Sequence, residues 1–243
     1  LHRILDDAAT KMRSSDPDEA RVGTFYAACN DTQAIEAGGL QALQPELDRI
    51  AAIASPAALV AEIGRLDAFG VDNGLSFGSE ADTRDSSRTI GGIGFGGLGM
   101  PDRDYYLNPR SAAVRAAYGH YLATQLGYLG EDSATAKRHA RAIVALETSL
   151  ARATPPNADL RDPLATYHPM SVANVARIAP HIPWRAFLAG FGRSDVRFVD
   201  LSLPQYTRVF DRAVATVPFE TWQAALRTHV VTTLTLGLPK RFD

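Results

Sequence analysis

The chain has 243 residues, a formal net charge of -2 and a hydrophobic content of 46%. That length and apolar content suffice for one large domain or two small ones, and the near-balanced charge gives no reason to expect a nucleic-acid partner. No apolar run approaches the roughly 18 residues of a membrane-spanning helix, and the first residues lack a signal-peptide pattern. The single cysteine, Cys29, excludes an internal disulfide.

Amphipathic helices are predicted first. The chain opens inside a helical pattern, so we expect its natural N-terminus to precede Leu1. The next helix is predicted from Asp18 to Asn30, and its spacing makes Cys29 an expected buried, small apolar residue beside Phe25. Ser55, followed by proline, is an expected N-cap for a helix that runs towards residue 69.

The glycine-rich segment 69–100 predicts a β-hairpin instead of a helix. Its two apolar stretches, 69–77 and 89–95, are expected strands, and the polar run 79–88 is an expected flexible turn. Residues 92–97 fit the dinucleotide pattern G-x-G-x-x-G, but the glycines fall inside the second strand and no helix pattern follows Pro101. A bend or a close backbone approach in an edge strand is therefore favoured over nucleotide binding. Another short strand is expected at 196–201.

The rest of the chain predicts helices. A helix from Ser111 to Tyr128 precedes one that Ser133 is expected to cap and that runs to about Ala153. On the second of these, His139 lies on the apolar face, where a neutral, hydrogen-bonded core histidine is favoured over a ligand. After a loop, further helices are expected to start at positions 171, 183, 204 and 218. The predicted fold class is mainly α: a single multi-helical lobe over 1–243 with one small β-hairpin at about 69–100.

No catalytic or metal-binding residue can be assigned. None of the six histidines is followed by glutamate, so the chain lacks His-Glu-x-x-His, the helical motif in which two imidazoles hold zinc and the carboxylate acts as general base. The run Asp102-Arg103-Asp104 favours helix caps and ion pairs over acid–base catalysis, because no third group accompanies it. Tyr105 and Tyr106 are expected to pack, with their hydroxyls on polar partners. Substrate-binding residues stay unknown.

One stretch resembles a known family. Residues 96–107 read GGLGMPDRDYYL, which is similar to a signature in the non-catalytic half of the neprilysin and endothelin-converting-enzyme family of zinc metallopeptidases, bacterial type. Segments 22–31, 147–153, 161–170 and 222–239 resemble further family segments in the same order. We predict structural roles for these signature residues: Gly97, Gly99, Pro101, Asp102, Arg103, Asp104, Tyr105, Tyr106, Arg161, Asp162, Pro163 and Tyr167.

The resemblance implies that the chain is an incomplete part of the N-terminal domain of such a peptidase. The parent enzyme would bind zinc and hydrolyse small peptides, and its catalytic lobe, absent from this chain, would be the partner. This segment alone, with no cofactor, would be inactive. The resemblance also suggests that the parent enzyme is extracytoplasmic. In animal members of the family, the cysteine that matches Cys29 forms a disulfide with a cysteine further downstream. The alternative is a free-standing helical scaffold that binds peptides or proteins without enzyme activity.

Overall fold

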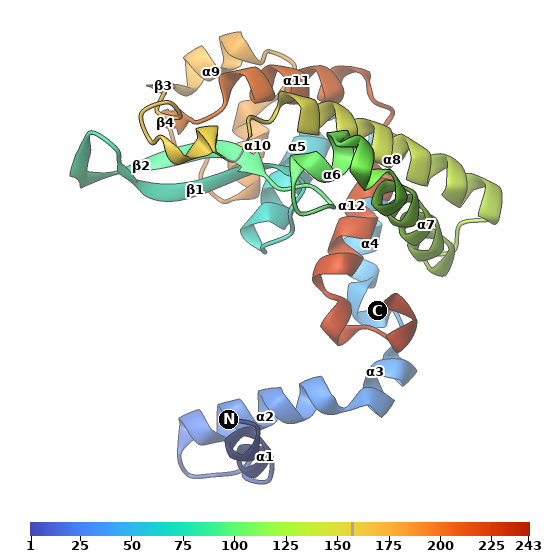
Figure 1. The fold of residues 1–243 in the computed structure, drawn as a ribbon. Helices are drawn as coiled ribbons and strands as arrows, with labels where there is room; N and C mark the ends of the chain where they lie inside the picture. The colour runs from blue at the N-terminus through green and yellow to red at the C-terminus, as the bar shows by residue number, and fades with distance from the viewer. Residues whose placement is uncertain (157) are drawn as a thin grey trace. The chain divides into compact units, whose positions relative to one another are not determined.

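The computed structural model describes residues 1–156 and 158–243, which divide into two compact units, 1–45 with 234–243 and 46–233. Most of the described residues are helical, and the strands form one four-stranded sheet (Figure 1). The predicted fold class, mainly α with a small β element, is confirmed. Among the described helices, none is both long and apolar enough to cross a membrane.

The first unit consists of short helices. They are α1 (His2–Ala9), α2 (Pro17–Asn30) and α3 (Thr32–Gly38), followed by 3-10 turns at Gln41–Leu43, Thr235–Gly237 and Lys240–Phe242. Asp16 starts α2 by accepting the backbone N–H groups of Asp18 and Glu19. The carboxylate of Glu36 accepts the Lys240 N–H at 2.6 Å, which holds the C-terminal residues to the helices of this unit.

The buried face of α2 differs from the predicted one. Gly23 faces α1 so closely that a Cβ there would lie 2.0 Å from the Ala8 carbonyl oxygen. The expected apolar face points away instead, since Phe25 is 74% exposed and Cys29 is exposed. The prediction of a buried Cys29 is therefore wrong, because a glycine contact between two backbones decides which side of α2 is covered.

The second unit contains the sheet and the longer helices. Its helices are α4 (Gln44–Ala51), α5 (Pro56–Ala68), α6 (Arg103–Leu107), α7 (Ala112–Tyr128), α8 (Ser133–Ala153), α9 (Val172–Ile178), α10 (Trp184–Gly190), α11 (Pro204–Thr216) and α12 (Phe219–Thr233). Ser55 caps α5 as predicted, accepting the Ala58 N–H. The N-cap of α8 is Asp132 and not the predicted Ser133, because its carboxylate accepts the N–H groups of Ala134 and Thr135.

The sheet has the order β1-β2-β4-β3, formed by β1 (Gly74–Asp82), β2 (Asp85–Gly96), β3 (Pro169–Ser171) and β4 (Phe198–Leu201). The strands β1 and β2 pair antiparallel from Gly74 opposite Gly96 to Asp82 opposite Asp85, with a register shift between Ala81 and Asp82, so the predicted flexible turn at 79–88 is mostly strand. The strand β2 also pairs in parallel with β4, which makes it an interior strand and not an edge strand. Its glycines admit close neighbours: a Cβ at Gly91 would lie 2.8 Å from the Phe77 ring.

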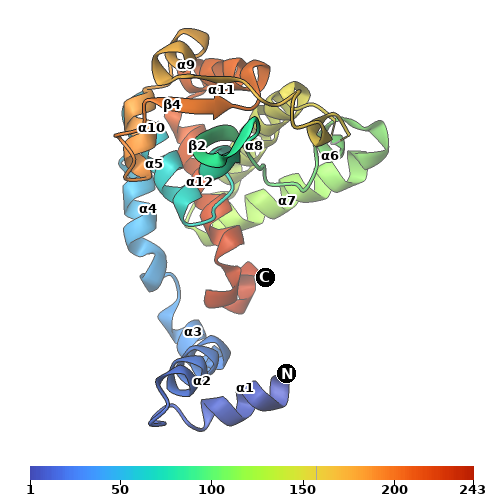
Figure 2. The ribbon, with the colours of Figure 1, turned by 90° about the vertical axis from the view of Figure 1, so that its left-hand side faces the viewer.

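Two glycines let α5 and α10 approach closely (Figure 2). A Cβ at Gly64 on α5 would lie 2.4 Å from the Phe187 carbonyl oxygen, and one at Gly190 on α10 would lie 2.3 Å from the Ala61 carbonyl oxygen. Because backbone atoms cannot move aside as a flexible side chain can, this crossing requires glycine on both helices.

The helices α7, α8 and α12 form a separate part of the core. Its buried side chains are Leu122, Leu126, Ala136, Ala140, Ile143, Ala224 and Ala225. The predicted inward face of α8 is confirmed, since His139 and Leu150 are both buried. This packing fixes the position of the polar groups on α8 that are described next.

Candidate functional site

A buried carboxylate joins the signature segment to three helices. Glu147 on α8 is 2% exposed and faces four donors. The backbone N–H of Gly99 lies 3.3 Å from its carboxylate, the Tyr106 hydroxyl 2.9 Å, the Tyr118 hydroxyl 3.1 Å and His229 Nε2 2.8 Å. We call these five residues the Glu147 node. Charge-assisted hydrogen bonds of this kind are among the stronger ones in proteins.

The local sequence explains how Tyr106 reaches Glu147. Asp102 caps α6 by accepting the Asp104 N–H at 2.8 Å, so the helix starts there and places Tyr106 one turn later. The Tyr106 hydroxyl donates to Glu147 and accepts the Met100 N–H at 2.8 Å. One side chain therefore fastens the preceding loop both to its own helix and to α8.

The signature glycines are required by close contacts in this loop. A Cβ at Gly99 would lie 1.8 Å from the Tyr118 hydroxyl, inside the node. Gly97 has a φ of +75°, a backbone conformation that other residues rarely adopt, and its Cβ position lies 2.5 Å from the Asp72 carboxyl carbon. The repeated glycines are thus explained by packing and backbone geometry, with no nucleotide needed.

The electrostatics of the node keep its hydroxyls as donors. Burial raises the pKa of both Tyr106 and Tyr118 above the usual value, and the negative charge of Glu147 raises each further. The Nδ1 atom of His229 is buried without a hydrogen-bond partner, so the ring proton is assigned to Nε2, where it faces Glu147. The node is consequently one acceptor group surrounded by donors.

The remaining predicted residues of the early signature are structural or exposed. Arg103 lies 3.5 Å from Asp104, as the predicted ion pair requires. Tyr105 is 39% exposed, so the expectation that both tyrosines pack holds for Tyr106 alone. Pro101 is exposed and precedes the Asp102 cap.

The later signature residues lie at a second place. The Tyr167 hydroxyl donates to Asp82 at the end of β1, at 2.7 Å, and this bond lowers the pKa of Asp82. Asp162 accepts the Leu164 N–H in a turn, while Arg161 and Pro163 are exposed beside it. The structure therefore does not gather the twelve predicted residues into one site.

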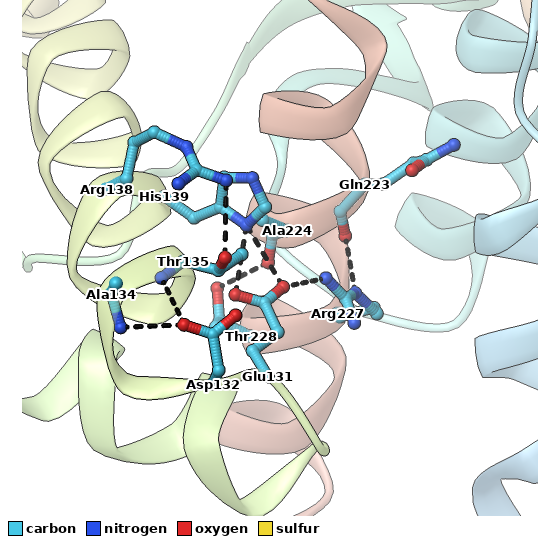
Figure 3. Close-up of polar contacts among 10 residues, drawn as sticks. All are labelled: Glu131, Asp132, Ala134, Thr135, Arg138, His139, Gln223, Ala224, Arg227 and Thr228. Carbon is cyan, nitrogen blue, oxygen red and sulfur yellow. Dashed lines mark hydrogen bonds and ion pairs between the residues drawn. The ribbon is translucent and has the colours of Figure 1, made fainter.

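A third polar cluster connects α8 to α12 (Figure 3). His139 Nδ1 lies 3.0 Å from both carboxylate oxygens of Glu131, and Arg227 forms an ion pair with the same carboxylate. The burial of His139 and its contact with Glu131 confirm that it is a hydrogen-bonded histidine of the core. The cluster fixes the α7–α8 connection against α12.

The contacts in these clusters hold helices and loops of the second unit together. Among the described residues, no group of three or more His, Cys, Asp or Glu side chains could hold a metal ion. The donors around Glu147 also use both of its oxygens, and its burial leaves no access for a substrate. The geometry defines a helical lobe whose signature loop is anchored internally.

Comparison with known proteins gives the family. A sequence model of peptidase family M13, for the N-terminal region, matches residues 1–243. The open-state structure of zinc metalloprotease Zmp1 from Mycobacterium tuberculosis is 28% identical, with a TM-score of 0.90, over 99% of this chain and 38% of that one. PepO from Lactobacillus rhamnosis shares the fold, at 18% identity and a TM-score of 0.75 over 96% of this chain and 38% of that one. Endothelin-converting enzyme 1 from Cavia porcellus is 37% identical over 111 residues, which are 44% of this chain and 15% of the enzyme.

The chain belongs to peptidase family M13 and corresponds to its N-terminal region. It spans well under half the length of the relatives it matches. The described residues provide no ligand set that fits a zinc ion, so no chemical role for zinc follows from this segment.

Proposed function

We propose that this chain is the substrate-enclosing, non-catalytic lobe of a neprilysin-like zinc metalloendopeptidase that hydrolyses small peptides. The observation that carries the proposal is the match of nearly the whole chain to 38% of the Zmp1 chain, at a TM-score of 0.90. The remainder of the parent protein would supply zinc and the catalytic groups. Peptides would be its substrates and the catalytic lobe its partner.

The internal anchoring of the lobe supports such a role physically. A lobe that excludes large substrates has to keep its shape when they press against it, and buried polar clusters together with close helix crossings resist deformation. The Glu147 node and the glycine crossing of α5 and α10 are of this kind. Selection would then depend on substrate size as well as on side-chain pockets.

The test compares one target sequence in two settings. The parent enzyme would be given the sequence as a free peptide and as a surface loop of a folded protein, and the two cleavage rates measured. We expect cleavage of the free peptide and protection of the folded protein. Equal rates would contradict an enclosing role. The isolated chain serves as control, and stoichiometric zinc together with peptidase activity in it would also contradict the proposal.

The gene sequence distinguishes the peptidase lobe from the alternative, a free-standing scaffold. An in-frame sequence downstream of Asp243 that encodes His-Glu-x-x-His would support the peptidase. A stop codon soon after Asp243 would support the scaffold. An extracytoplasmic location is part of the same proposal, and fractionation of source cells would test it.

A further inference from the structure

A surface groove follows the contact between α7 and α8, which lie side by side in the second unit (Figure 1). Its volume is about 420 Å³. The floor consists of small or apolar side chains: Ala116, Gly119 and Ala123 from α7, and Ala140 and Val144 from α8. Since a Cβ added at Gly119 would meet no atom within 4 Å, the groove is open at this point.

The charged side chains that line the groove are all basic. They are Arg115, Lys137 and Arg141, beside His120, and no carboxylate is among the lining residues. The helix α7 contains no Asp or Glu, and the only acid on α8, Glu147, is buried in its node. This concentration of cations is unexpected in a chain with a net charge of -2.

An acid in the adjoining hollow does not neutralise these basic side chains. Glu131 borders the adjoining hollow, which shares His120 and Lys137 with the groove. Its carboxylate already holds His139 and Arg227 (Figure 3). Lys137 and Arg141 are exposed on α8 and remain available to a ligand.

We propose that the α7–α8 groove binds acidic peptides that carry apolar side chains and belong to a separate molecule. An apolar floor accepts the apolar side chains, and the surrounding cations orient and attract the carboxylates. Arg115 is held in place by the carbonyl oxygens of Tyr105 and Asn108, at 3.0 and 2.8 Å, so less freedom is lost when it binds. This site needs no catalytic lobe and does not depend on the proposed peptidase function.

The test measures binding to the 243-residue chain by fluorescence anisotropy. The probe is a labelled peptide of alternating Glu and Leu, compared with peptides of alternating Lys and Leu and of alternating Glu and Ser. We expect the Glu-Leu peptide to bind at least about tenfold more tightly than either, and more weakly as salt screens the charges.

Variants locate the binding. Lys137→Glu with Arg141→Glu should weaken the Glu-Leu peptide at least about tenfold, because two attractions become repulsions. Gly119→Leu adds a side chain at a point where its Cβ would meet no atom within 4 Å, so it should occupy the groove and weaken binding of the Glu-Leu peptide to a similar extent. Arg138→Glu is the matched control, since it makes one of the same charge changes on α8 outside the groove lining, and binding should stay within about twofold.

Three outcomes would overturn the proposal. Equal binding of the Glu-Ser peptide would mean that charge alone attracts the ligand. Unchanged affinity in the Gly119→Leu variant, with circular dichroism showing a normal fold, would place the peptide elsewhere. In the longer parent chain, protection of Gly119→Cys from a maleimide, in a Cys29→Ser background, would mean that another part of the same chain covers the groove.

Discussion

Glu147→Ala tests whether the buried node holds the second unit together. The substitution leaves the hydroxyls of Tyr106 and Tyr118 and the Nε2–H of His229 buried without their acceptor. A buried donor without a partner costs about 1–3 kcal/mol, and the substitution leaves three side-chain donors in that state. We therefore expect the free energy of unfolding to fall by at least about 3 kcal/mol.

Urea unfolding followed by tryptophan fluorescence measures this loss. Both tryptophans, Trp184 and Trp222, are buried in the second unit, so the signal reports on the unit that contains the node. Glu220→Ala, which changes an exposed acid in the first turn of α12, is the control and should cost less than about 1 kcal/mol. A loss of under about 1 kcal/mol for Glu147→Ala would refute the reasoning.

A double-mutant cycle sharpens the result. Tyr106→Phe alone removes a hydrogen bond to a charged group and should cost about 1.5–3 kcal/mol. In the Glu147→Ala background the hydroxyl has lost its acceptor and keeps only the Met100 N–H, so the same change should cost less than it does in the original chain. Additive losses would mean that the two groups do not interact in solution.

Three further predictions concern other places in the second unit. Gly190→Ala should lower stability by about 1–3 kcal/mol, because its methyl group would strike the backbone of α5. Asp132→Ala should cost about 1 kcal/mol through loss of the α8 cap. Burial raises the pKa of Asp67 from 3.8 to about 6, so the folded state holds this proton more tightly than the unfolded chain does. The stabilising contribution of protonated Asp67 is complete below pH 3.8 and is lost as the pH rises through about 6. We set this loss of stability at about 1 kcal/mol because the side chain is partly exposed. Asp67→Asn should remove the loss.

The same urea assay checks each of these predictions. Gly119→Ala is the control for the glycine change, because its methyl group meets open space in a helix, and it should be neutral or slightly stabilising. If Gly190→Ala behaved in the same way, the helix crossing would tolerate a larger spacing. If Asp132→Ala were as stable as the original chain, Asp132 would not contribute to capping α8. If the pH dependence of stability were unchanged in Asp67→Asn, another group would be responsible for the titration.

Helix positions were predictable from the sequence because caps and prolines act locally. Ser55 before proline gave the start of α5, and Ser171 accepts the Asn174 N–H at the start of α9. At α8 two adjacent residues could cap, and local sequence does not decide between Asp132 and Ser133. The carboxylate prevails in the structure because it reaches two N–H groups at once.

Contacts between distant segments were not predictable in this way. Only three residues of β3 pair with β4, and a sequence this short with so few apolar residues cannot be told from a loop. The polar segment 79–88 becomes strand because its backbone pairs across the hairpin, although its side chains show no alternating burial. For Glu147 there was a signal, an acid within the apolar face of a helix, but its partners lie up to 82 residues away in the sequence.

The parallel pairing of β2 with β4 has a consequence for the order of folding. Ser202 donates to the Ile93 carbonyl oxygen across 109 residues of chain, whereas β1 and β2 meet across a two-residue turn. Closing a long loop costs entropy before its contacts repay it, so we expect β1 and β2 to pair before β4 joins them. During synthesis on the ribosome, the β2 edge that β4 later covers therefore stays open until most of this segment has emerged, and this edge is where a stalled chain would pair wrongly with a neighbour.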